Sequence, residues 1–158
     1  MEQIIFEGVD PTELARVLAG GVDHAGNTIQ AFTDLDGGWQ LRCCLADSVP
    51  GDEIAFIAFS PFDWNGPFRE TGPIVVHARG CAATWQIERL PDDFDQRPMT
   101  LRPYNREHRI LYDLVEPVPA GVGLNVQVRT LLQQPDVAEV YGRNPQGGCF
   151  AFVARRAG

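Results

Sequence analysis

Residues 69–81 read Arg69-Glu70-Thr71-Gly72-Pro73-Ile74-Val75-Val76-His77-Ala78-Arg79-Gly80-Cys81, and no other stretch of the chain gathers as many reactive side chains. Glycine permits unusual backbone angles, and proline fixes φ and lacks an N–H donor, so Thr71-Gly72-Pro73 predicts a turn before a strand that begins at Ile74. Side chains alternate faces along a strand. The pattern therefore predicts an apolar face with Ile74, Val76 and Ala78 and an opposite face with Val75, His77 and Arg79.

The remaining sequence predicts one α+β domain over residues 1–158, with a mostly antiparallel sheet and two main helices. The first helix spans residues 11–18, after the capping residue Asp10 and with a proline at its first position. The second spans residues 122–134 and ends before Pro135. A short helix near Pro91 is also expected. Strands are predicted at residues 3–6, 28–33, 39–45, 54–59, 98–104 and 108–114, and a terminal hairpin at residues 137–141 and 149–153.

Composition excludes several classes of function. The formal net charge is -8, which opposes binding to nucleic acid or to an anionic membrane surface. All 13 basic residues are arginines, so lysine Schiff-base chemistry and a P-loop are excluded. No apolar run approaches the roughly 20 residues that span a bilayer, and the N-terminus lacks a secretory signal pattern. We therefore expect a cytoplasmic protein, and a homodimer is compatible with the sequence.

The four cysteines are expected to be reduced thiols, because the chain shows no secretory signal. If residues 39–45 form a strand, Cys43 and Cys44 point to opposite faces. Cys43 then belongs to the core, where a free thiol behaves as a small apolar group. Cys44 shares a face with Arg42, whose charge favours the thiolate.

The function that we expect is binding or transformation of a small anionic metabolite. Arginine presents a planar fork suited to a carboxylate or phosphate, and asparagine can orient a ligand. The predicted substrate-binding residues are Arg42, Arg79, Arg143 and Asn144. Histidine titrates near neutrality, so it can transfer a proton. The predicted catalytic residues are His77, its orienting partner Glu70, and the thiol Cys44.

Three alternatives remain open. In the first, His77 takes the proton from a nucleophilic Cys44 or Cys81. In the second, zinc binds to a set whose residue types suit it: Cys44, His77, Cys81 and Cys149. The paired Cys-x-x-Cys spacing is missing, so neither a metal nor a cofactor is expected. In the third, the protein is a non-enzymatic interaction module that uses the aromatic loop at residues 59–68. A loop that folds back over the core is the competing interpretation of these aromatic residues.

Several short motifs, taken in order, resemble a bacterial family called domain of unknown function 1203. They are Arg42-Cys43-Cys44-Leu45, the Pro50-Gly51 turn, Thr71-Gly72-Pro73 with Val76-His77-Ala78, and Arg143-Asn144 followed by Gly148-Cys149-Phe150. The resemblance spans nearly the whole chain. It implies a complete bacterial domain and assigns no catalytic residue.

Overall fold

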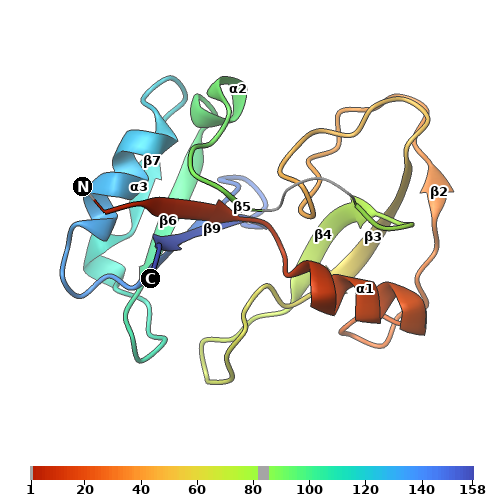
Figure 1. The fold of residues 1–158 in the computed structure, drawn as a ribbon, viewed down its shortest axis with the longest axis horizontal. Helices are drawn as coiled ribbons and strands as arrows, with labels where there is room; N and C mark the ends of the chain where they lie inside the picture. Colours follow the sequence, from red (N-terminus) through yellow and green to blue (C-terminus); the bar gives the residue numbers. More distant parts are fainter. Residues whose placement is uncertain (1, 82–85) are drawn as a thin grey trace. The chain divides into compact units, whose positions relative to one another are not determined.

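The computed structural model describes residues 2–81 and 86–158 (Figure 1). Contacts within the chain divide it into two compact units, and neither is continuous in sequence. Unit 1 comprises Met1–Glu7, Gly66–Phe68 and Gln86–Gly158, and unit 2 comprises Gly8–Asn65 and Arg69–Trp85. The predicted α+β class with mostly antiparallel sheets is confirmed. The prediction of a single domain stays a prediction.

Unit 1 is built on a six-stranded sheet in the order β5-β1-β9-β8-β6-β7. All the pairings recorded between its strands are antiparallel. The strands are β1 (Ile4–Glu7), β5 (Gln86–Ile87), β6 (Met99–Tyr104), β7 (Glu116–Val118), β8 (Glu139–Arg143) and β9 (Phe150–Arg156). The helices are α2 (Asp92–Asp95), the 3-10 helix η1 (Tyr112–Leu114) and α3 (Leu124–Leu132). The predicted second main helix, the short helix near Pro91 and the terminal hairpin are therefore confirmed.

The predicted strand at residues 108–114 is wrong. The Asn105 side chain accepts hydrogen bonds from the backbone N–H groups of Glu107 and Arg109 and holds them in a turn. Ile110 makes one isolated bridge with Tyr104, and the chain then enters η1. The strand that follows is β7, which has only three residues and contains a proline, so its alternation is too short to predict.

Unit 2 contains α1 (Pro11–Gly20) and a three-stranded antiparallel sheet in the order β2-β3-β4, with β2 at Phe32–Thr33, β3 at Glu53–Phe59 and β4 at Gly72–His77. The predicted first helix is confirmed together with its caps. Asp10 Oδ1 accepts a hydrogen bond from the Thr12 N–H, and Gly21 ends the helix with a φ of 71°. Of the strand predicted at 28–33, only β2 forms.

Strand β4 begins at Gly72 instead of Ile74 and ends at His77, before Ala78. Within it the predicted alternation is confirmed: Ile74 and Val76 are buried, whereas Val75 and His77 are only partly covered. The strand predicted at residues 54–59 forms as β3, and its Phe56 side chain is 51% exposed. Phe56 lies opposite Val75 and packs against two other exposed rings, those of Phe32 and Trp39. One face of this sheet therefore carries exposed aromatic side chains.

Residues 39–45 do not form the predicted strand. Leu41 makes a single parallel bridge with Val75 at the edge of β4, and Arg42–Cys44 then form a turn. The turn closes through a 2.9 Å hydrogen bond from the Leu41 N–H to the Ala46 carbonyl. An apolar alternation of this length is compatible with a strand, but one parallel bridge leaves the rest of the segment free to turn.

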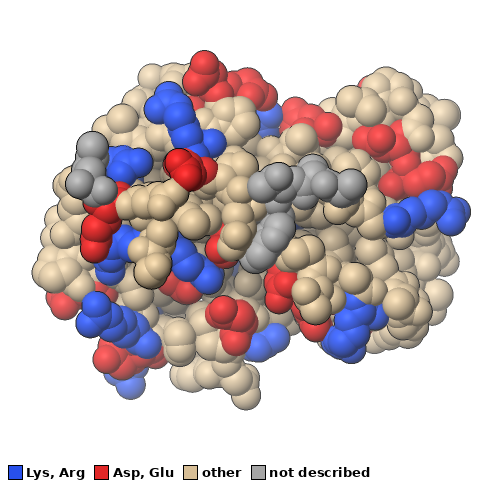
Figure 2. Space-filling model, viewed as in Figure 1, with Lys and Arg blue, Asp and Glu red and all other residues tan. Residues whose placement is uncertain are grey.

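Two aromatic side chains of the loop at residues 59–68 are buried: Phe62 is 4% exposed and Trp64 is 8% exposed. Arg69, just after this loop, donates a hydrogen bond to the Trp64 carbonyl. Throughout residues 2–81 and 86–158, the structure contains no helix with the length and apolar character needed to span a bilayer. The face drawn in Figure 2 intersperses acidic and basic side chains, without a continuous basic surface on its described residues.

Candidate metal centre

Four potential metal ligands of unit 2 converge in space: Cys43, Cys44, His77 and Cys81. One ligand atom from each, a thiol sulfur or an imidazole nitrogen, lies within 4.8 Å of all the others. Cys43 is buried and 5% exposed, and the other three are half-buried. Among the described residues, this is the group of histidine, cysteine and carboxylate side chains arranged closely enough to hold a metal ion.

The edge of β4 brings the first two ligands together. The Arg42 N–H donates a 2.9 Å hydrogen bond to the Val75 carbonyl, beside the parallel bridge of Leu41. Two residues further along both segments, Cys43 reaches His77. The Cys43 sulfur lies 3.4 Å from His77 Nδ1 and accepts a hydrogen bond from the His77 backbone N–H at 3.5 Å.

The other two ligands come from turns. Cys44 lies in the turn that follows the parallel bridge, and the next residue, Leu45, has a φ of 59°. A residue with a Cβ in this left-handed region costs about 1–2 kcal/mol, so the turn is held by its surroundings rather than by local preference. Cys81 follows a second turn, because β4 ends at His77 and Gly80 takes a φ of 93°. Glycine adopts that angle without a steric penalty.

His77 has a carboxylate on its other side. Nε2 of His77 lies 3.4 Å from Asp52 Oδ2, and Asp52 Oδ2 also accepts a 2.9 Å hydrogen bond from the Val49 N–H. The side chains of His77 and Asp52 are about equally accessible, at 25% and 24%. With Nε2 directed at the carboxylate, Nδ1 faces the thiols. This is the orientation of a metal-binding histidine that donates its second N–H to a carboxylate.

The thiol groups of Cys43 and Cys44 differ in pKa. A hydrogen bond from the Cys43 thiol, with further hydrogen bonds from the Ala46 N–H and the Cys81 thiol, lowers the pKa of Cys44 to about 6. The same interaction with Cys44, together with burial, raises the pKa of Cys43. Without a metal, the cluster therefore carries a thiolate at Cys44 near neutral pH and a protonated thiol at Cys43. The prediction that the two cysteines point to opposite faces is wrong, because the turn directs both into one cluster.

Three of the other predicted site residues belong to unit 2 but differ in their surroundings. Arg42 is buried, at 3% exposure, and its guanidinium donates a 2.5 Å hydrogen bond to Gln40 Oε1. Glu70 and Arg79 are exposed, and the carboxylate found beside His77 is Asp52 instead of Glu70. The role of these residues in binding an anion stays a prediction.

Arg143 and Asn144, also predicted to bind substrate, belong to unit 1 at the end of β8. Arg143 donates a 3.1 Å hydrogen bond to the Gly148 carbonyl, and the Asn144 backbone N–H donates a hydrogen bond to the Cys149 carbonyl. Cys149 lies in the same glycine-rich loop region of unit 1. The cluster in unit 2 thus contains Cys43 in the place that the sequence assigned to Cys149.

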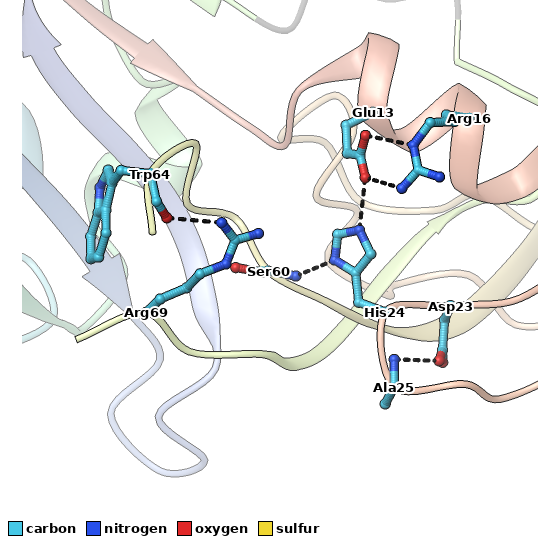
Figure 3. A network of polar contacts seen from close by, with 8 residues as sticks. All are labelled: Glu13, Arg16, Asp23, His24, Ala25, Ser60, Trp64 and Arg69. Carbon is cyan, nitrogen blue, oxygen red and sulfur yellow. Dashed lines mark hydrogen bonds and ion pairs between the residues drawn. The ribbon is translucent and has the colours of Figure 1, made fainter. Parts of the chain in front are cut away.

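A second histidine of unit 2 is bound on both sides (Figure 3). His24 Nδ1 accepts a 2.9 Å hydrogen bond from the Ser60 N–H, and Nε2 lies 2.9 Å from Glu13 Oε1. Its ring stacks on Phe59 at 4.4 Å. Arg16 and His24 together lower the pKa of Glu13 to about 2. His24 therefore links α1 to the residue that follows β3, and both of its ring nitrogens are engaged.

The sequence argument missed Cys43 and Asp52. No local signal marked Cys43 as a ligand, because only the parallel pairing of Leu41 with Val75 places it beside His77. Asp52 carries no local signal either, because it belongs to the Val49-Pro50-Gly51-Asp52 turn and reaches His77 only through the fold.

A family model described as "Protein of unknown function (DUF1203)" matches residues 38–156. No curated protein and no solved structure matches the chain. The matched range includes all four clustered ligands and Asp52.

Proposed function

We propose that this chain, which belongs to the family described as "Protein of unknown function (DUF1203)", binds one zinc ion in unit 2 through Cys43, Cys44, His77 and Cys81. The observation that carries this proposal is the 4.8 Å limit on the distances among four potential ligand atoms from separate parts of the chain.

These distances fit a zinc tetrahedron after a small contraction. Zinc binds sulfur at about 2.3 Å and imidazole nitrogen at about 2.0–2.1 Å, so two thiolates on one ion lie about 3.8 Å apart. The 3.4 Å between Cys43 Sγ and His77 Nδ1 already matches one edge of such a tetrahedron. Small rotations of half-buried side chains are enough to bring the remaining ligands into place.

The ligand types favour zinc over the hard cations. Thiolate and imidazole suit zinc and other soft or borderline transition metals, whereas magnesium and calcium select oxygen ligands. Three thiolates also neutralise the ion, with one negative charge in excess. The low pKa of Cys44 means that one ligand is already ionised near neutral pH.

The proposed role of the ion is structural. Four protein ligands fill a tetrahedral zinc centre, whereas catalytic zinc keeps one position for water or substrate. The ion would join two turns, the one after Leu41 and the one at Gly80, to the end of β4, which is itself paired with β3 up to His77. Binding would then contribute directly to the stability of unit 2.

The test is elemental analysis of the reduced protein after reconstitution and removal of unbound metal. About one zinc per chain is expected, and it should be lost in Cys44→Ser and kept in Cys149→Ser, which is the matched control from unit 1. Circular dichroism of both variants separates loss of the ligand from loss of the fold. Failure of the wild-type protein to retain zinc, or equal retention by both variants, would contradict the proposal.

A second candidate function is thiol chemistry on a small anionic metabolite, with Cys44 as the nucleophile. It is favoured by the low pKa of Cys44, since the thiolate is the reactive form. Screening metal-free protein against electrophilic and anionic metabolites tests it. Turnover or covalent capture at Cys44 by the protein that retains no zinc would favour this candidate over the zinc centre.

A further inference from the structure

We propose that the zinc centre is also a peroxide-sensitive switch, in which Cys44 and Cys81 form a disulfide and the metal is released. This inference rests on the proposed zinc site and adds regulation to it. The feature that suggests it is an unequal distribution of accessibility and backbone restraint among the three thiols.

Accessibility separates Cys43 from the other two cysteines. Cys43 is 5% exposed and is held beside β4 by the His77 N–H, whereas Cys44 and Cys81 are half-buried. Oxidation of a thiolate requires access for the oxidant. Peroxide therefore reaches Cys44 or Cys81 more easily than Cys43.

Geometry selects the same pair. Disulfides usually join residues whose Cα atoms are about 4.4–6.8 Å apart. Neighbouring residues such as Cys43 and Cys44 have Cα atoms about 3.8 Å apart across a trans peptide, which is shorter than that range. Cys44 and Cys81 come from two separate turns, and their sulfur atoms lie within 4.8 Å of each other. Neither of the two belongs to a strand, so their side chains can approach without breaking a sheet ladder.

The chemistry needs one equivalent of a peroxide as the oxidant. The Cys44 thiolate attacks one peroxide oxygen and the O–O bond breaks, which gives a sulfenic acid and hydroxide. The Cys81 thiolate then attacks the sulfenic sulfur, forming the S–S bond and expelling a second hydroxide. Two electrons pass from the two sulfurs to the two peroxide oxygens. Cys43 and His77 remain as the only ligands of the four, which is too few for a stable zinc site.

The experiment treats the zinc-loaded full chain with one equivalent of hydrogen peroxide and follows free zinc with a chromophoric chelator. Trypsin cleaves after arginine, so Cys43 and Cys44 fall in the peptide 43–69 and Cys81 in the peptide 80–89. Fragmentation of the linked peptides then distinguishes Cys43 from Cys44. The expected result is release of about one zinc per chain together with one Cys44–Cys81 disulfide, both reversed by a dithiol reductant and zinc.

Cys149→Ser is the control, and it should respond as the wild-type protein does. Retention of zinc after the peroxide is consumed would overturn the switch while leaving the zinc centre intact. A disulfide that contains Cys43, or release accompanied only by sulfinic acid, would overturn it as well. A protein that cannot be loaded with zinc at the start would overturn the zinc centre itself, which is a separate result.

Discussion

Asp52 offers a test of the metal centre that leaves all four proposed ligands in place. Its carboxylate lies 3.4 Å from Nε2 of His77, and in the proposed site it would orient the ring so that Nδ1 binds the metal. In Asp52→Asn the amide oxygen can still accept the hydrogen bond from the Val49 N–H, but the negative charge beside the imidazole is lost. The substitution therefore removes the charge that orients His77 and keeps His77 itself as a ligand.

The expected loss of zinc affinity can be placed within a known range. Removing a carboxylate behind a metal-bound histidine typically weakens binding by about 10–100-fold. The contact here is 3.4 Å long and the Asp52 side chain is 24% exposed, so solvent screens part of its effect. We expect a change near the lower limit, about tenfold, which corresponds to about 1.4 kcal/mol.

Competition between the protein and a chromophoric chelator of known affinity measures this change. Asp36→Asn is the matched control, because it removes the same charge from an exposed residue of unit 2. The control should leave the affinity unchanged. Equal affinities for wild type and Asp52→Asn, or equal losses in both variants, would refute the assignment of Asp52 as the residue that orients His77.

Three further predictions concern the geometry and charge of the cluster. A Cβ on Gly8 would lie 2.3 Å from the Arg42 carbonyl oxygen, so Gly8→Ala should lower the free energy of unfolding by about 1–3 kcal/mol and weaken zinc binding. Gly20→Ala, which has open space around its Cβ, should do neither. Equal unfolding curves for the two variants would show that the turn at Arg42 can move away. In metal-free protein, iodoacetamide should modify Cys44 well before Cys43, because the pKa of Cys44 is lowered to about 6 and that of Cys43 is raised. The rate at Cys44, followed by mass spectrometry, should rise through a midpoint near pH 6. Equal rates at the two cysteines would contradict this difference in pKa. Zinc binding must remove the proton from Cys43, so the apparent zinc affinity should rise at least about tenfold per pH unit above pH 6. Below pH 6 it should rise more steeply, because Cys44 is protonated as well. Calorimetric titrations that give affinities within about twofold of each other at pH 6.5 and pH 7.5 would show that no thiol is deprotonated on binding.

Local sequence signals predicted the elements whose ends carry clear capping or turn residues. The first main helix has a capping aspartate, a proline at its first position and a terminating glycine, and the structure forms it as α1. The alternation of β4 is confirmed because one face is buried and the other is partly covered, which is the situation that a two-residue period describes. These features depend on contacts between near neighbours in sequence.

The metal centre depends on pairings that the sequence does not specify. Residues 39–45 alternate as a strand does, yet only Leu41 is bridged to β4, and the turn after it reverses the predicted direction of one cysteine. Cys81 approaches His77 because the strand ends and Gly80 turns the chain. Both events are decided by long-range packing. Of the zinc set considered as an alternative, the structure therefore brings together Cys44, His77 and Cys81, and it adds Cys43 in place of Cys149.

X-ray absorption at the zinc edge of the reconstituted protein shows directly whether three sulfurs and one nitrogen of unit 2 hold one zinc ion. The proposed ligand set predicts a coordination shell of three sulfur atoms at about 2.3 Å and one nitrogen at about 2.0–2.1 Å. Cys149→Ser should leave the sulfur count unchanged. A shell made only of nitrogen and oxygen atoms, or a sulfur count that changes in Cys149→Ser, would contradict the account.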